Sequence, residues 1–262
     1  MDYDFLKVGT DQGVATIALC RPDVLNSFNR RMAQELQRSL TKAGEDSSVR
    51  AVLLTGSGRG FCAGQDLTEA TGVDLTSVDL GDIVKACYTP VVRSIRELEK
   101  PVVCAVNGVA AGAGANLAFA CDIVIAAEEA SFIQSFSKIG LVPDTGGSFF
   151  LPRLVGPARA TALMFLAEKI SAKKALEWGM IHDVVPATVL IDTATALARQ
   201  LAAMPTRGLA LTKKLINASL SNDLPSQLAL EEEMQRQAGR TADYAEGVRA
   251  FLEKRKPTYT GR

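Results

Sequence analysis

Apolar residues in the first half of the chain form short compact runs that alternate with longer periodic stretches. The short aliphatic runs predict strands over residues 14–20, 51–55, 102–106 and 123–127. The periodic stretches predict helices over residues 32–43 and about 82–98, with Asn29 as a candidate N-cap of the first. Strands that alternate with helices indicate an α/β layer architecture with right-handed crossovers.

The pattern changes after about residue 190. Amphipathic stretches predict helices over residues 190–203, 207–220, 227–239 and 242–254, and no strand pattern remains. Short amphipathic helices cannot bury their apolar faces alone, so we expect them to pack on the core or on a neighbouring subunit. We therefore predict a core over residues 1–200 and a helical oligomerisation region over residues 201–262.

Composition narrows the function classes. The chain has 262 residues, of which 47% are hydrophobic, so it can bury a large core. Its 29 basic and 29 acidic residues balance, which gives no global field for nucleic acid or an anionic membrane. The N-terminal segment lacks the pattern of a signal peptide, and no later run has the length of a membrane span. We expect a cytoplasmic protein without nucleic-acid or membrane partners.

Histidine and cysteine usage limits the catalytic chemistry. A Ser-His-Asp, Cys-His or multi-histidine metal site would have to use His182, the single histidine. It follows Gly179, a candidate helix C-cap, and this position favours a structural or surface role. The five cysteines lie far apart without a CxxC pair, which argues against a disulfide framework and a zinc site. We expect most of them to be small buried hydrophobes, and we predict no metal site.

Two glycine-rich stretches follow predicted strands. In residues 56–67, Gly58, Gly60 and Ala63 fit a relaxed dinucleotide pattern, but the segment that follows is polar and aperiodic instead of helical. Residues 107–121 do resemble a short helix opened by glycines. Its N-terminal amides would suit an anion, although close packing of a small-residue helix on a strand explains the composition equally well.

Asp144 is an isolated acid in a loop after Pro143. A turn aspartate is most often a capping or surface residue. Its flanking residues are apolar, however: Leu141, Val142, Phe149 and Phe150. A carboxylate placed among such side chains would have a raised pKa, as a general base requires.

These segments together resemble the enoyl-CoA hydratase/isomerase, or crotonase, superfamily over nearly the whole chain. The resemblance is carried, in this order, by RPDVLNSFN, GRGFCAGQDL, AVNGVAAGAGANLAFACDIVIAA, FSKIGLVPDTGG, WGMI and EGVRAFLEKRKP. Each segment is loosely diagnostic alone, but their combination and order are specific. The resemblance implies a crotonase-like spiral core of ββα units, a C-terminal helical region, and homotrimers that often pair as hexamers.

The resemblance also implies site residues. It places an oxyanion hole for a thioester oxygen at the backbone amides of Gln65 and Ala113. It implies that CoA or substrate contacts come from Arg21, Val24, Leu25, Ala63, Asp66, Leu67, Thr68, Asn116 and Phe136. Lys254 is a candidate for a CoA phosphate, across subunits, with a solvated helix charge as the alternative. The partner is an acyl-CoA thioester, and no separate cofactor is expected because CoA is part of the substrate.

The resemblance further bears on the reaction. Asn116 and Phe136 match the two glutamates with which the family's hydratases activate water, and neither can act as a general base. Asp144 matches a position where several relatives carry a catalytic aspartate. A single base suffices for isomerisation of a CoA thioester, such as ring expansion of 1,2-epoxyphenylacetyl-CoA to an oxepin or a 3-enoyl to 2-enoyl shift.

Other activities remain open at this stage. They are an enoyl-CoA hydratase, a relative that uses Asp144 as a nucleophile, and a non-catalytic acyl-CoA-binding subunit. The nucleophilic alternative would need aromatic and histidine support that Thr89 and Phe136 do not suggest.

Overall fold

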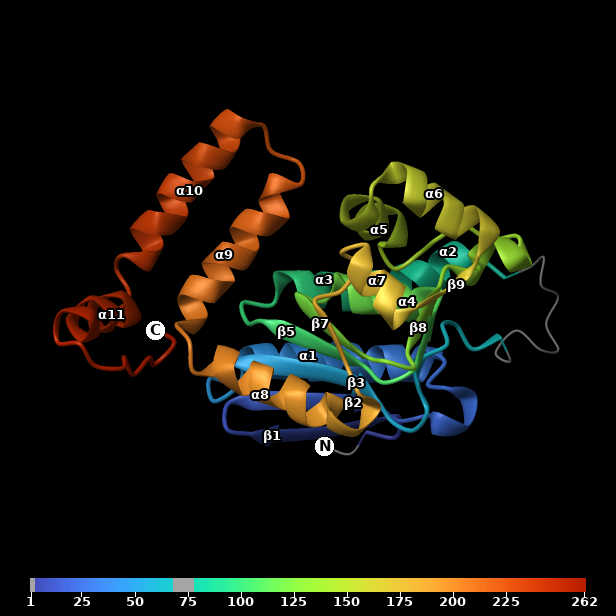
Figure 1. Cartoon of the computed structure of the whole chain (residues 1–262), viewed down its shortest axis with the longest axis horizontal. Coiled ribbons are helices and arrows are strands. Elements are labelled where there is room, and N and C mark those ends of the chain that lie inside the picture. Colours follow the sequence, from blue (N-terminus) through green and yellow to red (C-terminus); the bar gives the residue numbers. More distant parts are fainter. Residues whose placement is uncertain (1–2, 68–77) are drawn as a thin grey trace.

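Two sheets lie at the centre of the computed structural model, which describes residues 3–67 and 78–262 (Figure 1). The larger has the order β1-β2-β3-β5-β7-β10 and the smaller β4-β6-β8-β9. The strands of the larger sheet are β1 (Leu6–Asp11), β2 (Val14–Leu19), β3 (Ala51–Gly56), β5 (Val102–Val106), β7 (Ile123–Ala127) and β10 (Asp183–Val185). Those of the smaller sheet are β4 (Gly60–Cys62), β6 (Val109–Ala111), β8 (Ser131–Ile133) and β9 (Lys169–Ser171).

The middle of the larger sheet is apolar on both faces. Strands β2, β3, β5, β7 and β10 run parallel, and every residue of β5 is buried. Parallel strands covered on both faces appear in a sequence as continuous apolar runs. This confirms the four predicted strands. The antiparallel edge strand β1, which exposes all but its first residue, carries no such run and was not predicted.

From β3 to β8, successive strands alternate between the two sheets. Each of the pairs β3 and β4, β5 and β6, and β7 and β8 places its first strand in the larger sheet and its second in the smaller. Helical segments return the chain between these pairs: η4 and α3 precede β5, and α4 precedes β7. The repetition produces a spiral of ββα units, which confirms the predicted fold class.

The helices of the core have the following bounds. They are α1 (Arg30–Glu45), α2 (Leu80–Ile83), the π-helical η4 (Val84–Tyr88), α3 (Thr89–Glu97), α4 (Ala113–Ala120), α5 (Gly147–Val155), α6 (Pro157–Leu166), α7 (Ala172–Glu177) and α8 (Leu190–Ala202). Short 3-10 turns are η1 (Pro22–Val24), η5 (Ser135–Ile139) and η6 (Ala187–Val189). The predicted N-cap is confirmed, because the Asn29 side chain accepts a 2.8 Å hydrogen bond from the Met32 amide. Helices α1 and α8 lie on opposite sides of the larger sheet (Figure 1).

The C-terminal helices extend away from the sheets (Figure 1). They are α9 (Thr206–Ser219), α10 (Leu224–Ala238) and α11 (Ala242–Leu252), and with α8 they confirm the four helices predicted after residue 190. Helices α9 and α10 pack against each other. The predicted division between residues 200 and 201 falls in the last turn of α8, and the division into two domains stays a prediction.

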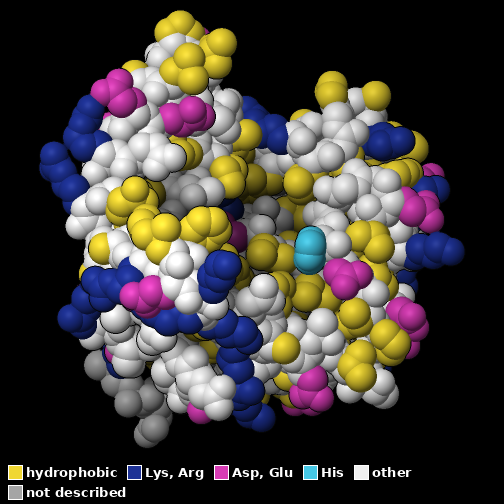
Figure 2. Space-filling view, turned by 60° about the vertical axis from the view of Figure 1, so that its left-hand side comes forward, with side chains coloured by type: hydrophobic (Ala, Val, Ile, Leu, Met, Phe, Trp, Pro, Cys, Tyr) yellow, Lys and Arg dark blue, Asp and Glu magenta, His cyan; other side chains and the backbone are white. Residues whose placement is uncertain are grey.

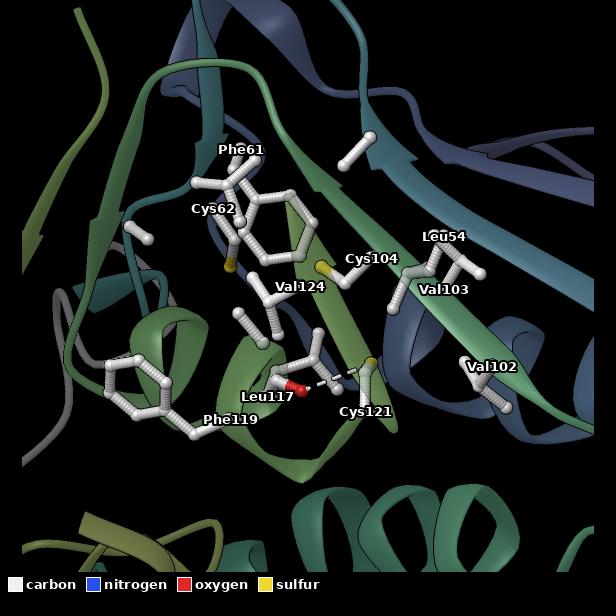
Figure 3. Close-up of a cluster of buried hydrophobic side chains, with 14 of the residues drawn as sticks. Leu54, Phe61, Cys62, Val102, Val103, Cys104, Leu117, Phe119, Cys121 and Val124 are labelled. Atoms are coloured by element: carbon white, nitrogen blue, oxygen red, sulfur yellow. Dashed lines mark hydrogen bonds between the residues drawn. The ribbon is translucent and has the colours of Figure 1, made fainter. Parts of the chain in front are cut away.

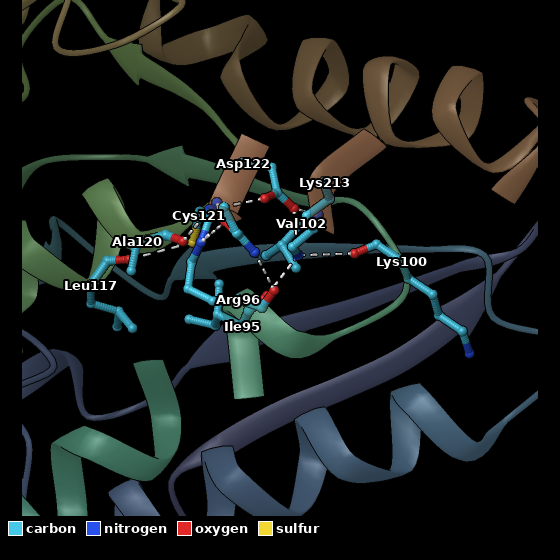
Figure 4. A network of polar contacts seen from close by, with 10 residues as sticks. Ile95, Arg96, Lys100, Val102, Leu117, Ala120, Cys121, Asp122 and Lys213 are labelled. Carbon is cyan, nitrogen blue, oxygen red and sulfur yellow. Dashed lines mark hydrogen bonds and ion pairs between the residues drawn. The ribbon is translucent and has the colours of Figure 1, made fainter. Parts of the chain in front are cut away.

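A polar network attaches α9 to the core (Figure 4). The Lys213 ammonium donates to the Ile95 carbonyl and to the Asp122 carboxylate, at 2.6 and 2.8 Å. Asp122 also accepts from Arg96 at 3.0 Å and from the Val102 amide at 2.8 Å. Burial lowers the pKa of Lys213, and Asp122 opposes that effect. One carboxylate therefore joins α3, β5 and α9.

Three cysteines lie in the apolar core around β4, β5 and α4 (Figure 3). Cys62, Cys104 and Cys121 are all buried. Burial raises the pKa of Cys62 to about 12 and that of Cys104 well above its ordinary value. The Cys62 and Cys104 thiols therefore stay protonated at neutral pH. Buried cysteines of this kind behave as small hydrophobes, as predicted. Among the described helices none is long and apolar enough to cross a membrane.

Candidate active site

A pocket of about 290 Å³ opens between the start of α4, the end of β4 and the loop before α5. The predicted site residues that line it are Ala63, Gln65, Leu67, Ala113, Phe136 and Asp144. The remaining lining residues are Gly64, Gly112, Ser135, Lys138, Ile139 and Leu141. Segments nearly 80 positions apart in the sequence thus meet at one cavity with mostly apolar walls.

The segment after β4 turns one backbone amide away from the neighbouring loop. The Phe28 amide donates to the Gly64 carbonyl at 2.7 Å, and the Asp66 amide donates to the Phe28 carbonyl at 2.8 Å. Phe28 and Gln65 thus form a parallel β-bridge in which the two residues flanking Gln65 make the hydrogen bonds. The Gln65 amide itself therefore points away from Phe28. The helix-opening dinucleotide pattern is excluded here, since β4 occupies Gly60–Cys62.

Two glycines let this segment approach α4. Gly64 has a φ of +94°, and an added Cβ would lie 2.9 Å from the Ala111 carbonyl and 3.7 Å from the Ala113 amide nitrogen. A Cβ on Gly114 would lie 2.2 Å from the Cys62 carbonyl oxygen. The backbone of α4 therefore rests on β4 at a separation that no other residue permits.

Helix α4 presents its N-terminus to the pocket. Ala113 is its first residue and lines the cavity. The amides of a first turn lack intrahelical partners and carry a partial positive charge. All eight residues of the helix are buried. The sequence allowed two interpretations of this segment, close packing of small residues and a helix N-terminus with free amides, and α4 has both features.

Asp144 is the one carboxylic acid among the described residues that line the pocket. Burial raises the pKa of its carboxyl group, while hydrogen bonds from the Thr145 side chain and from its own backbone amide act in the opposite direction. The Thr145 hydroxyl donates to Asp144 Oδ1 at 2.8 Å. The predicted direction of the pKa shift is confirmed.

The groups that surround Asp144 differ from its sequence neighbours. Val142 is 79% exposed and Phe149 is 40% exposed, and the Phe149 ring packs under the Arg153 guanidinium at 3.7 Å. Leu141 and the buried Phe136 line the pocket instead. Of the four apolar neighbours expected to desolvate the carboxylate, Val142 and Phe149 are exposed and do not line the pocket, and Leu141 lines it while 36% exposed.

Asn116 and Phe136 occupy different places in the site. Phe136 is buried and lines the pocket. Asn116 is fully buried and is not a lining residue; its side-chain amide donates to the Asp144 backbone carbonyl at 2.9 Å. The Asn116 oxygen accepts a 2.8 Å hydrogen bond from Gln134. In this structure Asn116 contacts the loop that carries Asp144.

The residues of the loop before α1 contact one another. Arg21 pairs with Asp66 at 2.7 Å and donates to the Ser27 carbonyl at 2.6 Å. Leu25 has a φ of +52°, and its carbonyl accepts from the Ala63 amide at 3.0 Å. Val24 is exposed at the start of this loop. Arg21 and Asp66 therefore hold the two loops together, and none of Arg21, Val24, Leu25 and Asp66 lines the pocket.

Two further predicted contacts are Thr68 and Lys254. Thr68 is outside the described residues. Lys254 follows α11, which lies at the opposite end of the molecule from β8 (Figure 1). Residues that follow β8 line the pocket, so within one chain Lys254 does not reach it. His182 is exposed and lines a separate hollow with Asp122 and Leu154, in agreement with a surface role.

Comparison with known proteins identifies the family. The profile described as enoyl-CoA hydratase/isomerase matches residues 9–262. The chain belongs to the enoyl-CoA hydratase/isomerase family. The family member named 1,2-epoxyphenylacetyl-CoA isomerase, from Escherichia coli strain K12, is 53% identical to it over 99% of each chain. A protein of Rhodobacter capsulatus named "probable enoyl-CoA hydratase" is 46% identical over the whole of both chains.

A solved structure of the family agrees with the fold. The enoyl-CoA hydratase from Bacillus anthracis superposes with a TM-score of 0.93 at 35% sequence identity, covering 99% of this chain and all of the other. The chain is therefore an acyl-CoA enzyme of this family with its characteristic two-sheet spiral. Of these relatives, one is named as an isomerase and two are named as hydratases.

Sequence reasoning missed two residues near Asp144: Thr145, which hydrogen-bonds its carboxylate, and Gln134, which hydrogen-bonds Asn116. Thr145 has a φ of +52°, a conformation that a β-branched residue rarely adopts, so nothing in its type predicts its place. Gln134 is buried and hydrogen-bonds Asn116. Its position between β8 and η5 carries no local pattern, and only the meeting of this segment with α4 shows its contact.

Proposed function

We propose that this chain isomerises a CoA thioester by shuttling one proton with Asp144. The observation that carries the proposal is that Asp144 is the single carboxylic acid among the described lining residues, and its pKa is raised by burial. Hydration by this family's usual mechanism needs two carboxylates. The matching positions hold Asn116 and Phe136, which cannot accept a proton.

The proposed chemistry uses the two loops that meet at the pocket. For a 3-enoyl thioester, Asp144 removes a proton from the carbon between the thioester and the double bond. The electron pair shifts into the thioester carbonyl, and the amides of Gln65 and Ala113 stabilise the oxyanion. Protonation of the distal carbon by Asp144 then yields the 2-enoyl thioester. Loss of one such donor typically raises the activation free energy by about 3–4 kcal/mol.

The specific substrate is proposed to be 1,2-epoxyphenylacetyl-CoA, converted to oxepin-CoA, with the 3-enoyl to 2-enoyl shift as a second activity. The support is the 53% identity to the isomerase of that name and the apolar lining by Phe136, Ile139 and Leu141. Both reactions conserve all atoms, so the proposal requires no separate cofactor, and CoA enters as part of the substrate.

Oligomerisation is part of the proposal. The C-terminal helices expose large apolar side chains, among them Leu224, Tyr244, Phe251 and Leu252. Figure 2 shows hydrophobic side chains gathered over this region and around the hollow beside it. A homotrimer, or a dimer of trimers, would cover them. In such an assembly Lys254 would contact CoA bound to a neighbouring subunit. Light scattering of the purified protein measures the assembly, and a monomer would contradict it.

The first experiment compares wild type with Asp144→Asn on three substrates. Each protein is mixed with a trans-3-enoyl-CoA, with 1,2-epoxyphenylacetyl-CoA and with crotonyl-CoA, and product formation is followed by absorbance and mass spectrometry. We expect isomerisation by wild type, its loss in Asp144→Asn, and little hydration. Fast hydration of crotonyl-CoA that survives the substitution would overturn the proposal.

Two further outcomes identify the alternatives. A covalent adduct on Asp144, detected by mass spectrometry of the quenched protein, would indicate nucleophilic catalysis instead of a proton shuttle. Tight binding of CoA thioesters without turnover of any of the three substrates, unaffected by Asp144→Asn, would indicate a binding subunit. Calorimetric titration with a non-reactive acyl-CoA distinguishes that case from a protein that has lost its fold.

A further inference from the structure

Asp144 is held through its backbone by a buried side chain of α4. The Asp144 carbonyl accepts from Asn116 Nδ2 at 2.9 Å and from the Gly147 amide at 2.8 Å. Asn116 is fully buried, and a Cβ added to Gly147 would lie 2.2 Å from its Nδ2. The first turn of α5 therefore packs directly on the Asn116 amide, with no room for a water molecule between them.

The conformation of this loop requires such support. Thr145, immediately after Asp144, has a φ of +52°, and a β-branched residue in this region stores backbone strain. Strained residues persist where surrounding contacts fix them. Here the fixing contacts are the two hydrogen bonds to the Asp144 carbonyl. Loss of the Asn116 contact would free the loop to relax and to move the Asp144 carboxylate.

Helix α4 contributes one proposed oxyanion amide and also contacts the loop that holds the proposed base. Ala113, whose amide is proposed to bind the oxyanion, begins α4, and Asn116 lies three residues further, about one turn away. Helix α4 thus positions both the Ala113 amide of the proposed oxyanion hole and the loop that carries Asp144. A displacement of the base by about 1 Å from such a frame can cost 10²-fold in rate.

Gln134 fixes the orientation of Asn116. Its Nε2 donates to Asn116 Oδ1 at 2.8 Å, and Gln134 is itself buried. If the Asn116 amide turned over, its oxygen would face the Asp144 carbonyl and its NH2 would face the Gln134 NH2. Both contacts would be repulsive. The Asp144 carbonyl can only accept a hydrogen bond, so it requires the orientation in which Asn116 donates to it, and the donor from Gln134 stabilises that orientation.

We infer that Asn116 is a positioning residue for Asp144 and that Gln134 acts through Asn116. The inference rests on the proposed function and adds a role for two neutral side chains that do not touch the pocket. In the family's hydratases a glutamate is implied at the position of Asn116, so here a buried structural amide occupies the place of a reacting carboxylate.

The test measures kcat, KM and the pH dependence of isomerisation for wild type, Asn116→Ala, Gln134→Met and the double variant. We expect kcat to fall about 10- to 100-fold in Asn116→Ala with KM changed by less than about threefold. Gln134→Met should show a smaller loss, and the double variant should match Asn116→Ala because the two residues act in series. The acidic limb of the pH profile should move to lower pH as the loosened loop admits water to Asp144.

A matched control separates positioning from general stability. Asn217 also donates its side-chain amide to a backbone carbonyl, that of Arg96 at 3.0 Å, but on α9 away from the pocket. Asn217→Ala should lower the melting temperature without shifting the pH profile. The inference is overturned if Asn116→Ala keeps the wild-type kcat and pH profile, or if the losses in Asn116→Ala and Gln134→Met simply multiply. If Asn116→Ala does not fold, Gln134→Met alone decides by its pH profile.

The outcome for Asp144→Asn keeps the two hypotheses apart. Loss of activity in Asp144→Asn together with unchanged Asn116→Ala rejects the positioning role and leaves the proposed function standing. Retained activity in Asp144→Asn rejects the proposed function itself, whatever Asn116→Ala does.

Discussion

The side-chain amide of Asn116 donates a 2.9 Å hydrogen bond to the backbone carbonyl of Asp144. One residue is the fourth of a helix whose N-terminus lines the pocket, and the other is the single acid among the described lining residues. The contact joins segments 28 positions apart. One helix therefore positions both the proposed oxyanion amide of Ala113 and the proposed base Asp144.

Asp144→Asn should stabilise the folded chain while abolishing isomerisation. Burial raises the pKa of Asp144 in the folded state, so the folded protein binds this proton more tightly than the unfolded chain. The ionised carboxylate therefore costs stability at neutral pH, and the cost disappears as the pH falls below the ordinary range of an aspartate. Melting temperatures across pH should show Asp144→Asn above wild type at pH 7, with the gap closing in acid. A lower melting temperature at pH 7 would contradict the burial argument.

Thr145→Val should shift the pH dependence of activity upward. The Thr145 hydroxyl donates to Asp144 Oδ1, and this bond favours the ionised form and lowers the pKa of Asp144. Valine keeps the β-branched shape and removes the donor, so the pKa rises and the base ionises at higher pH. The kcat profile should lose most activity at its acidic end. Thr41→Val, which removes an exposed helical hydroxyl contact, should leave the profile in place, and a profile unchanged in both variants would reject the role of Thr145.

Gly114→Ala should disable the site through backbone displacement. Its Cβ would lie 2.2 Å from the Cys62 carbonyl oxygen and 2.7 Å from the Cys62 Cβ. Relief of this overlap would displace β4 or α4, and with it one of the amides of Gln65 and Ala113 that are proposed to bind the oxyanion. We expect kcat to fall at least about 10²-fold, the loss typical of a removed oxyanion donor. Gly9→Ala is the control, since its added Cβ meets nothing within 4 Å. Comparable kinetics in the two variants would show that the approach of α4 to β4 is not required.

Asp122→Asn should destabilise the attachment of α9. The substitution leaves Lys213 and Arg96 facing each other around a neutral amide. Removing one partner of a fully buried ion pair costs about 3–5 kcal/mol, and somewhat less is expected here because Asp122 is partly exposed. Asp11→Asn breaks the exposed pair with Arg199 and should cost less than about 1 kcal/mol. Urea unfolding of both variants measures the difference, and equal midpoints would show that the network contributes little.

The sequence by itself determined the positions of those strands and helices whose burial follows a regular pattern from residue to residue. Strands β3 and β5 are covered on both faces and appear as aliphatic runs, and the C-terminal helices carry amphipathic periodicity. The order of the glycine-rich and Asp144 segments also sufficed to indicate the family. The edge strand β1 and the three-residue strands of the smaller sheet escaped prediction, because an exposed strand has no apolar run and a three-residue run is too short to indicate a strand.

Only the tertiary structure decided what surrounds Asp144. The sequence placed Val142 and Phe149 beside the carboxylate, whereas both face solvent and the buried Phe136 lines the pocket in their place. It assigned Asn116 to substrate binding, whereas the fold sets this side chain against the Asp144 backbone. A sequence records which chemical groups are available and how each segment is patterned. Which groups desolvate a carboxylate depends on contacts between distant segments, and those exist only once the two sheets and α4 have packed together.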